Sequence, residues 1–308
     1  MKLGFIGLGK MGKAIVEHLL EQGVTVVLYN RTRERSDEFA SEFRNQNSEI
    51  RKYGELILSY TYKEFTEKLE FPRVIWIMVE QGKAVDEVID NLIVSGIKSE
   101  DIVIDGGNSF YKDTIRRFNR LKMSGINYLD AGTSGGIEGA RKGACLMVGG
   151  DKAVFDSVKP ILEKIAISGG LTYFGPTGAG HFVKMVHNGV EYGMVQALGE
   201  GFEILSRKIN KVDLLEVAQN WSRGSVVRGW LIELLAKALA KDPTLKEFSG
   251  AVGGGATGEW TIDTASELMV EAPVITASLE ARKKSKVKPT FAGKIVSALR
   301  REFGGHSD

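Results

Sequence analysis

A short segment in the second half of the chain, KMVHNGVEY, carries several side chains that could do chemistry. Its polar residues stand at offsets 0, 3, 4, 7 and 8, which places them on one face of an α-helix. These residues are Lys184, His187, Asn188, Glu191 and Tyr192. A base, an acid, an imidazole and an amide on one stripe can bind a polar ligand and transfer protons to it.

The alternative without a functional role is a solvated helix face, which is the common explanation of a Lys/Glu stripe. Here an asparagine and a tyrosine join the stripe, and apolar residues typical of a buried helix flank it. The flanking residues are Phe182, Val183, Met185, Val186, Val190, Met194 and Val195. For His187 alone, a hydrogen-bonded core histidine would be the more common explanation. The rest of the chain must therefore indicate what could bind at the stripe.

The bulk composition excludes several classes of protein. With 308 residues, 43% hydrophobic and 26% charged, the chain has an ordinary globular composition and can form two domains. A net charge of +2 without a long basic run gives no reason to expect nucleic acid. The basic cluster RKKSKVK at residues 282–288 is expected to be a solvated segment or a site for a small anion.

The cysteine content and the apolar runs bear on the compartment. The single cysteine, Cys145, excludes an internal disulfide and fits a reducing environment. The apolar start MKLGFIGLGK is short and glycine-rich, so we expect a strand there rather than a signal peptide. No apolar run approaches the length of a membrane span, and we expect a cytoplasmic protein without membrane partners.

A glycine-rich loop lies near the N-terminus. The apolar run Leu3–Ile6 predicts a buried strand, and GLGKMG follows it at once, with an amphipathic helix behind. This is the pattern G-x-G-x-x-G, formed by Gly7, Gly9 and Gly12. Between a strand and a helix these glycines permit a tight turn, approach of pyrophosphate to the backbone, and close packing. The loop therefore predicts a dinucleotide site.

The end of the second strand, VTVVLYN at residues 24–30, bears on the choice of cofactor. A carboxylate at this point usually holds the ribose 2′-hydroxyl of NAD. The chain instead has Asn30, Arg31 and Thr32, and a guanidinium with a hydroxyl can bind a 2′-phosphate. An exposed loop arginine is the alternative. We expect NADP as the cofactor, with NAD possible.

Further apolar strands at residues 74–79, 101–107 and 127–132 alternate with helical stretches at residues 33–43, 84–92 and 112–123. This alternation predicts a Rossmann-type doubly wound parallel sheet, whose ligands bind at the carboxyl ends of the strands. Two loops there stand out, DGGNS at residues 105–109 and TSGG at residues 133–136.

The second half of the chain lacks strand signals after GPTGAG at residues 175–180. Helices are expected at residues 181–207, 214–220, 229–241 and 263–284, with a glycine-rich loop at residues 250–260. We therefore predict an NADP-binding Rossmann domain over residues 1–177. An all-helical domain for substrate binding and dimerisation, with a C-terminal tail, is predicted over residues 178–308.

Over its whole length, the chain resembles the β-hydroxyacid dehydrogenase superfamily and, within it, the short-chain decarboxylating 6-phosphogluconate dehydrogenases. The broad motifs are GLGKMG, TSGGIEGARKG with LMVGG, and GAGHFVKMVHN. The more specific ones are NRT, DGGNS, His-Asn followed by Glu-Tyr, ATGEWT and RREFGGH. The resemblance implies an oxidoreductase of the pentose phosphate pathway and of gluconate utilisation. It would oxidise 6-phosphogluconate at C3 with NADP and release CO2 and ribulose 5-phosphate, without a metal.

In this family pattern Lys184 matches the base and Glu191 the acid. Lys184 would take the hydroxyl proton and then, as an ammonium, polarise the ketone. A neutral lysine requires a pKa well below roughly 10.4. Glu191 would protonate C1 of the enediol. The two residues lie two helical turns apart, roughly 10.5 Å along the axis, which can bracket a small sugar acid.

The resemblance also assigns binding positions. Those expected to contact the cofactor are Gly7, Leu8, Gly9, Lys10, Met11, Gly12, Asn30, Arg31, Thr32, Val79, Glu80, Gln81 and Asn108. Those expected to bind the carboxylate and hydroxyls of the substrate are Asn108, Ser134, Gly135, Gly136, His187 and Asn188. Those expected to hold the distal phosphate are Tyr192, Thr257 and Arg282.

The tail implies a second subunit. Arg300 and His306 match a motif that crosses a dimer interface to the partner's phosphate, so a homodimer or higher homo-oligomer is expected. A frayed basic terminus is the alternative. Two departures stand against the family pattern. Gly255 replaces a phosphate-binding lysine, and Glu80-Gln81 replaces a Lys-Ala pair. The long helical extension of larger members is also absent.

Two other functions remain open at this point. A 3-hydroxyisobutyrate-type dehydrogenase would share the lysine and the SGG loop, but it would have no use for Arg300 and His306. A non-catalytic NADP-binding protein would need neither Lys184 nor Glu191. Turnover after cofactor binding distinguishes the last possibility from the two enzymes.

Overall fold

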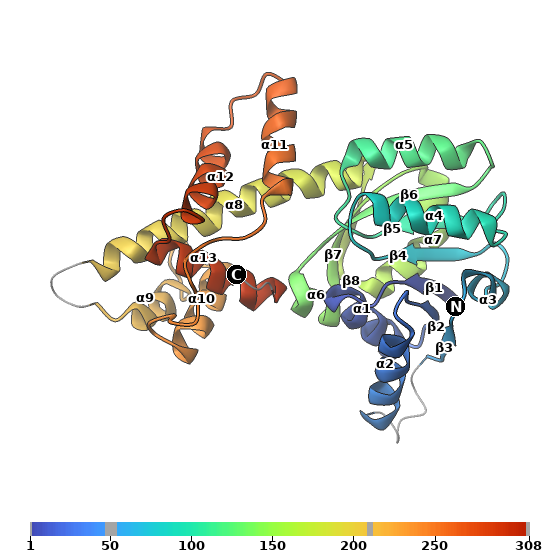
Figure 1. The fold of residues 1–308 in the computed structure, drawn as a ribbon, viewed down its shortest axis with the longest axis horizontal. Coiled ribbons are helices and arrows are strands. Elements are labelled where there is room, and N and C mark those ends of the chain that lie inside the picture. Colours follow the sequence, from blue (N-terminus) through green and yellow to red (C-terminus); the bar gives the residue numbers. More distant parts are fainter. Residues whose placement is uncertain (1, 47–53, 208–211, 306–308) are drawn as a thin grey trace. The chain divides into compact units, whose positions relative to one another are not determined.

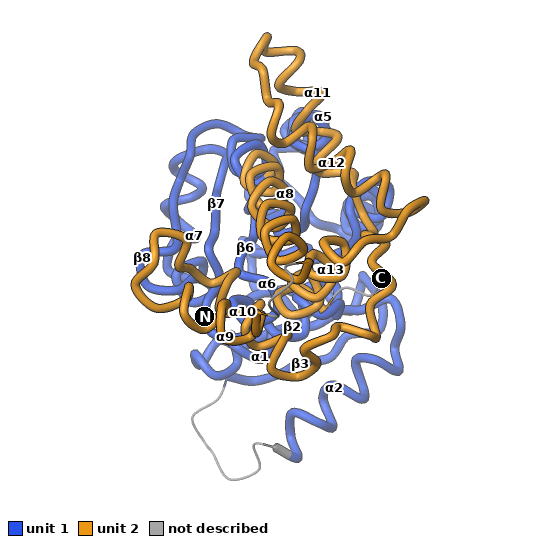
Figure 2. The backbone as a smooth tube through the Cα atoms, turned by 90° about the vertical axis from the view of Figure 1, so that its left-hand side faces the viewer, with its two compact units in different colours: residues 1–184 blue, residues 185–308 orange. Residues whose placement is uncertain are grey.

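The computed structural model describes residues 2–46, 54–207 and 212–305. By its internal contacts the chain divides into two compact units, Met1–Lys184 and Met185–Asp308 (Figure 2). The predicted domain boundary after residue 177 lies a few residues before this division. Among the described residues, no helix is both long and apolar enough to cross a membrane.

Unit 1 is built on an eight-stranded sheet in the order β3-β2-β1-β4-β5-β6-β7-β8 (Figure 1). The strands are β1 (Lys2–Ile6), β2 (Thr25–Tyr29), β3 (Leu56–Ser59), β4 (Val74–Ile77), β5 (Ile102–Asp105), β6 (Asn127–Ser134), β7 (Ala144–Gly149) and β8 (Ala166–Gly175). The pairs from β3 to β6 are all parallel, whereas β6 and β7 are antiparallel. The predicted Rossmann-type fold is confirmed, but β7 and β8, which are parallel to each other, run opposite to the strands β1–β6.

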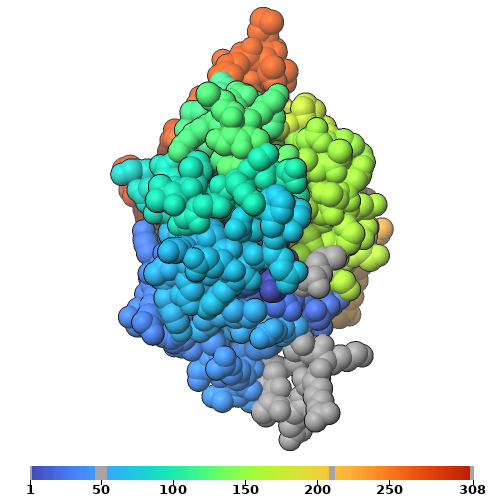
Figure 3. All heavy atoms as spheres, turned by 90° about the vertical axis from the view of Figure 1, so that its right-hand side faces the viewer, coloured from blue at the N-terminus to red at the C-terminus, as the bar shows by residue number. Residues whose placement is uncertain are grey.

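Helices cover both faces of this sheet. They are α1 (Lys10–Glu21), α2 (Arg33–Gln46), α3 (Tyr62–Glu67), α4 (Lys83–Val94), α5 (Tyr111–Lys122), α6 (Gly136–Lys142) and α7 (Lys152–Ile165). Residues of α1, α2 and α7 share one apolar cluster with the strands, and residues of α3, α4 and α5 share another. In the space-filling view, the blue-to-green atoms of the segment from α3 to α5 cover much of the visible face (Figure 3).

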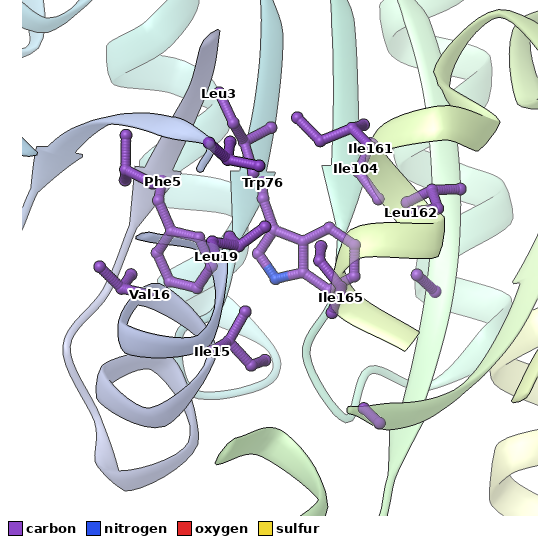
Figure 4. Packing of buried hydrophobic residues seen from close by; sticks show 14 of the residues in the cluster. Leu3, Phe5, Ile15, Val16, Leu19, Trp76, Ile104, Ile161, Leu162 and Ile165 are labelled. Carbon is purple, nitrogen blue, oxygen red and sulfur yellow. The ribbon is translucent and has the colours of Figure 1, made fainter. Parts of the chain in front are cut away.

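Trp76 lies in the middle of the first cluster (Figure 4). It is fully buried on β4, among Phe5 of β1, Ile15 and Leu19 of α1, and Ile165 of α7. Large apolar side chains therefore fill the space between sheet and helices, which is what near-continuous apolar strands require. This packing holds the carboxyl ends of β1, β4 and β5 in place.

Unit 2 is helical. Helix α8 (Ala179–Ser206) begins in unit 1 and continues into unit 2. The other helices are α9 (Leu214–Trp221), α10 (Trp230–Lys241), α11 (Ala256–Glu267), α12 (Pro273–Ser285) and α13 (Phe291–Gly304). Buried residues of α8, α9, α10 and α13 form one core, in which Phe202 meets Trp221 edge-on at 5.5 Å between ring centroids. The predicted helical second domain is confirmed.

Some predicted elements are wrong. The expected helix from Asp263 to Lys284 is two helices, because α11 ends at Glu267 and Pro273 begins α12. Proline has no N–H and a fixed φ, so it fits the first helical position and not an interior one. Part of the expected loop at residues 250–260 is helical, since α11 begins at Ala256. Strands β3, β7 and β8 and helices α3, α6, α7 and α13 were not predicted from the sequence.

Candidate active site

The glycine-rich loop between β1 and α1 has the geometry of a dinucleotide cradle. Gly7 has φ +108°, and a Cβ there would lie 2.3 Å from the carbonyl oxygen of Met78. A Cβ at Gly12 would lie 2.2 Å from the carbonyl oxygen of Gly7, whereas one at Gly9 would have nothing within 4 Å. Gly9 is the N-cap of α1 and brings no capping side chain. Gly7 and Gly12 thus permit close packing, and Gly9 leaves the helix N-terminus open to a phosphate.

Asn30 ties this loop to the end of β2. Its Oδ1 accepts a hydrogen bond from the N–H of Leu8 at 3.0 Å, and its Nδ2 donates to the carbonyl of Thr32 at 2.9 Å. Lys10 and Met11 begin α1 beside it. Asn30 therefore uses both ends of its amide to shape the loop. Arg31, between the two bonded segments, is exposed.

A second arginine at this strand end was not recognised from the sequence. The Arg33 guanidinium lies over the ring of Tyr60, 4.1 Å from its centroid, and the Tyr60 hydroxyl donates to Asp37 at 2.6 Å. Tyr60 follows directly on β3, the strand beside β2. The signal was weak, because residue 60 is remote in the chain and only strand pairing brings it to Arg33.

The loops after β4 and β5 emerge from neighbouring strands, because Ile77 pairs with Asp105 in parallel register. The first carries the predicted cofactor positions Val79, Glu80 and Gln81, and the second carries Asn108. A Cβ at Gly107 would lie 3.2 Å from the carbonyl oxygen of Val79. The structure therefore brings these two groups of predicted residues together.

Asp105, completely buried, holds the DGGNS loop in shape. Its carboxylate accepts hydrogen bonds from the Ser109 hydroxyl at 2.7 Å, the Tyr128 hydroxyl at 3.0 Å and the Gly107 N–H at 3.1 Å. Burial and the Asp105 charge raise the pKa of Tyr128 well above its ordinary value, so Tyr128 remains a neutral donor. An aspartate at the end of an otherwise apolar strand was the signal that could have identified this role.

The TSGG loop follows β6. Thr133 donates from its hydroxyl to the carbonyl of Gly106 at 3.1 Å, which ties this loop to the DGGNS loop. Ser134 ends the strand, Gly135 is the N-cap of α6 with φ +117°, and Gly136 begins that helix with φ +61°. Left-handed backbone at two consecutive glycines turns the chain sharply, and this exposes main-chain groups that can bind a ligand.

Asp130, also completely buried, anchors the start of α8. Its two carboxylate oxygens accept the N–H groups of Gly178 at 2.7 Å and of His181 at 2.8 Å. A carboxylate at a helix N-terminus satisfies orphan donors and favours the helix dipole. The imidazole of His181 in turn lies 2.7 Å from the Thr114 hydroxyl on α5. These contacts fix the first turns of α8 against β6 and α5.

Lys184 lies one turn further along α8 and is 8% exposed. The helix passes so close to β6 that a Cβ at Gly132 would lie 2.4 Å from Cβ of Lys184 and 3.0 Å from its Cγ. The position of Lys184 thus depends on a glycine in the neighbouring strand. The signal in the sequence was a glycine inside a strand pattern, which often marks a close approach of another backbone.

We expect Gly132→Ala to lower the free energy of unfolding by about 1–3 kcal/mol, as overpacking in a tight interior does. The atoms in its way are the stem of Lys184 and helix backbone, which cannot rotate aside. Gly201→Ala in α8 is the control, because a Cβ there has nothing within 4 Å. Adding a methyl in a helix is expected to raise stability by about 0.5–1 kcal/mol. Urea unfolding of both variants measures the difference, and equal midpoints would contradict the close approach.

Beyond Lys184, the polar stripe of α8 is withdrawn from solvent. Asn188 and Tyr192 are each 8% exposed, and His187 and Glu191 are half-buried. His187 Nδ1 lies 3.1 Å from the Asn188 amide oxygen. The alternative of a solvated polar face is therefore wrong. On a mainly apolar helix, this inward polar face is the feature that a ligand site requires.

The apolar residues that flank the stripe are typical of a buried helix, but they are not all buried. Val186, Val190 and Met194 are 36%, 49% and 53% exposed, whereas Met185 and Val195 are buried. The polar stripe of α8 is therefore buried or half-buried, and one apolar stripe of the same helix is exposed to solvent.

Within unit 2, Tyr192 belongs to a buried cluster with Thr257, Arg282 and Arg300. The Tyr192 hydroxyl lies 3.1 Å from the Thr257 hydroxyl, and the Arg282 guanidinium lies 3.6 Å above the Tyr192 ring. A Cβ at Gly254 would lie 3.2 Å from Arg300 Nη2 and 3.9 Å from Arg282 Nη1. Arg282 and Arg300 are 4% and 9% exposed.

Two guanidinium groups beside one point favour an anion. Burial lowers the pKa of Arg282, and the positive charge of Arg300 lowers it further, while Tyr192 and Glu191 act in the opposite direction. A bound anion would relieve the repulsion between the two cations. The basic cluster at residues 282–288 is thus not wholly solvated, because its first residue is buried.

The predicted tail contact lies partly outside the described residues. Arg300 lies in α13 beside Arg282 of its own chain, whereas His306 lies outside the described residues. A crossing of the tail to a partner subunit stays a prediction. In the structure, the Arg300 guanidinium lies in the cluster with Arg282 of the same chain.

Comparison with known proteins gives the same two parts. Residues 2–175 match the family described as the NAD binding domain of 6-phosphogluconate dehydrogenase, and residues 180–299 match the 6-phosphogluconate dehydrogenase C-terminal domain. The chain is 45% identical to "Putative 6-phosphogluconate dehydrogenase YqeC" of Bacillus subtilis (strain 168), over 100% of this chain and 99% of that protein.

Two further proteins are informative. The chain is 37% identical to an NAD(+)-dependent, decarboxylating 6-phosphogluconate dehydrogenase of Haloferax volcanii, covering 99% of this chain and 98% of that one. The solved 6-phosphogluconate dehydrogenase of Plasmodium falciparum, described with NADP+ and with its substrate, has a TM-score of 0.83 at 36% identity. That alignment covers 94% of this chain and 62% of the longer one. The chain therefore belongs to the 6-phosphogluconate dehydrogenase family of oxidoreductases.

Proposed function

We propose that this protein oxidises 6-phosphogluconate with NADP and releases ribulose 5-phosphate and CO2. The observation that carries the proposal is the polar stripe of α8, which places Lys184, Asn188 and Tyr192 out of solvent on one helix face. Burying ionisable groups costs free energy, so a helix face that buries them is a good candidate for a ligand site. The substrate and the two alternative cofactors of this proposal are those of the Haloferax and Plasmodium proteins named above.

A bound NADP would supply the hydride acceptor for C3 of the substrate. Gly7, Gly9 and Gly12 leave space for its pyrophosphate at the N-terminus of α1. The loop with Val79, Glu80 and Gln81 and the one with Asn108 lie beside the same edge of the sheet. These residues are the proposed wall of the cofactor site.

Lys184 is the proposed base. Its neutral amine takes the proton of the C3 hydroxyl, and the resulting ammonium polarises the C3 ketone while the C1 carboxylate leaves as CO2. The electron pair released with CO2 forms a double bond between C2 and C3, and the C3 oxygen takes a proton from the Lys184 ammonium to give the enediol. Glu191, two turns along α8, then protonates the former C2, which becomes C1 of ribulose 5-phosphate. The hydroxyl on the former C3 returns its proton to Lys184 and becomes the C2 ketone of the product. The proposed contacts to the substrate hydroxyls and carboxylate come from Asn108, Ser134, Gly135, Gly136, His187 and Asn188.

The distal phosphate is assigned to Tyr192, Thr257, Arg282 and Arg300. Two arginines and two hydroxyl groups in one buried cluster match the charge and the acceptor oxygens of a phosphate monoester. Gly255 stands where the family pattern has a lysine, and Arg300, next to Gly254, provides a positive charge at this place. The absence of the lysine is thereby compensated within the same unit.

Turnover of the purified protein tests the function directly. We expect 6-phosphogluconate to reduce NADP with release of one CO2 for each cofactor reduced. Gluconate without the phosphate should be a far poorer substrate, because the arginine cluster then has no anion to bind. Reduction without CO2, or none with either cofactor, would reject the proposal and point to other 3-hydroxy acids.

The preference for NADP rests on Arg31. We expect Arg31→Ala to lower kcat/KM with NADP by roughly 10- to 100-fold, the equivalent of losing about 1.5–3 kcal/mol from hydrogen bonds to a charged group. The values with NAD should change little, because NAD lacks the 2′-phosphate. Arg44→Ala, another exposed arginine at the other end of α2, is the control. Equal losses with NADP and NAD would show that Arg31 does not read the phosphate.

A further inference from the structure

Arg117, on the inner face of α5, is almost completely buried, with 2% of its surface exposed. Its Nε donates to Asp86 Oδ1 at 2.9 Å, and its Nη2 donates to Asp86 Oδ2 at 3.2 Å and to the Gly82 carbonyl at 2.8 Å. On the other side, Nη1 lies 3.5 Å from the Ser109 hydroxyl and 3.7 Å from Asp105 Oδ2. One guanidinium thus contacts two separate segments of unit 1.

These two segments are the loops of the proposed site. Gly82 ends the loop after β4, directly behind Glu80 and Gln81, and is the N-cap of α4. Asp105 and Ser109 enclose the segment that carries Asn108 after β5. None of these contacts of Arg117 involves a position assigned to the cofactor or the substrate, yet they fix both loops from behind.

The chemistry of the guanidinium suits this task. It is planar and always charged, and it donates in several fixed directions, so it sets distances and angles that a flexible ammonium cannot set. Burial alone would lower the pKa of Arg117, but the hydrogen bonds to Asp86 and the charges of Asp105 and Asp86 raise it above its usual range. In the same network, burial tends to raise the pKa of Asp86, and the bonds from Arg117 and Arg116 lower it below its ordinary value.

We propose that Arg117 is a positioning residue that sets the distance between the loop carrying Glu80 and Gln81 and the loop carrying Asn108. That these loops bind cofactor and substrate rests on the proposed function. The contacts of Arg117 that join the two loops are independent of it. Displacement of a reacting group by about 1 Å can cost roughly 100-fold in rate, so a buried arginine behind the site can control catalysis without contacting the ligand.

The test compares Arg117→Lys with Arg116→Gln. Arg116 also donates to both oxygens of Asp86, at 3.1 and 3.0 Å, but its side chain is 55% exposed, and its other ion pair is with Asp113 of its own helix. We expect Arg117→Lys to lower kcat/KM on the order of 10- to 100-fold and to weaken binding of NADPH about fivefold or more. Arg116→Gln should leave both within about twofold of the wild type.

Assays well below the unfolding temperature separate positioning from stability. A protein that loses only stability keeps its kcat and its affinity for NADPH there, and that result for Arg117→Lys would overturn the proposal. Asp86→Asn is the second variant, because it weakens the hydrogen bonds to Arg117 and keeps a side chain of the same size in place. It serves as the test of the proposal if Arg117→Lys does not fold. We expect the same losses, smaller in size; unchanged kcat and NADPH affinity would again overturn the proposal.

Fluorescence titration with NADPH keeps the test independent of the substrate. If the wild type fails to turn over 6-phosphogluconate, the proposed function fails, and the affinity for NADPH still shows whether Arg117 holds the cofactor loop. An affinity of Arg117→Lys about fivefold weaker than that of Arg116→Gln then supports the inference. Equal affinities reject it.

Discussion

Lys184→Met is expected to lower kcat for 6-phosphogluconate oxidation by about 10²- to 10⁴-fold, the usual contribution of a general base. Methionine matches the length of the lysine stem, so the packing against Gly132 is retained. Affinity for NADPH should remain within a few-fold of the wild type, because the cradle of Gly7, Gly9 and Gly12 belongs to other elements. Steady-state kinetics and fluorescence titration measure the two effects.

Lys184→Arg distinguishes proton transfer from charge. An arginine keeps the positive charge, but it stays protonated at all ordinary pH values and cannot accept the hydroxyl proton. We therefore expect it to be nearly as inactive as Lys184→Met. A Lys184→Arg variant with most of the wild-type kcat would show that the residue acts only as a cation, and the base would have to be sought elsewhere, with His187 the first candidate.

The motifs with local geometry could be predicted from the sequence. The glycine loop after β1 and the polar stripe on α8 depend on spacing within one segment, and helix or turn geometry converts that spacing directly into position. For the same reason the parallel core of the sheet was predicted from continuous apolar runs. The structure then shows the stripe buried, which spacing alone could not decide.

What could not be predicted depends on pairs far apart in the chain. The close approach of Gly132 to Lys184 and the contact of Arg117 with Asp86 join segments that only the folded sheet brings together. The strand β8 contains Gly169 and Gly170, which weaken a strand pattern, and its pairing with β7 supplies what local preference lacks. Local sequence carries little of this information.

The outward apolar stripe on α8 has the same explanation. Val186, Val190 and Met194 have side chains typical of a core, and only the direction in which the helix faces its neighbours decides which stripe is buried. Composition cannot give that direction when a polar stripe is also withdrawn from water. An inward polar face is itself a departure from ordinary patterning, and such departures concentrate at functional sites.

Arg300→Met is expected to lower kcat/KM for 6-phosphogluconate by about 100-fold, mainly through a higher KM, because a buried charge-assisted contact to phosphate contributes about 1.5–3 kcal/mol. The matched control is Arg301→Met on the same helix. Arg301 points away, pairing with Glu247 at 2.7 Å and lying over the ring of Phe248. Its loss should leave KM within about twofold.

Mixed chains then decide which subunit Arg300 serves. Its Nη2 lies near the same point as Arg282 Nη1 of its own chain, so we expect co-expression of Lys184→Met with Arg300→Met chains to restore no activity. Each chain would still lack one group of its own site. If Arg300 instead crossed to a partner, a two-fold dimer with random pairing would regain about a quarter of the wild-type activity, because one site in each mixed dimer would be complete. That recovery would support the prediction that the tail crosses to the partner subunit. In each site, Arg282 would then be the arginine from the same chain that binds the phosphate.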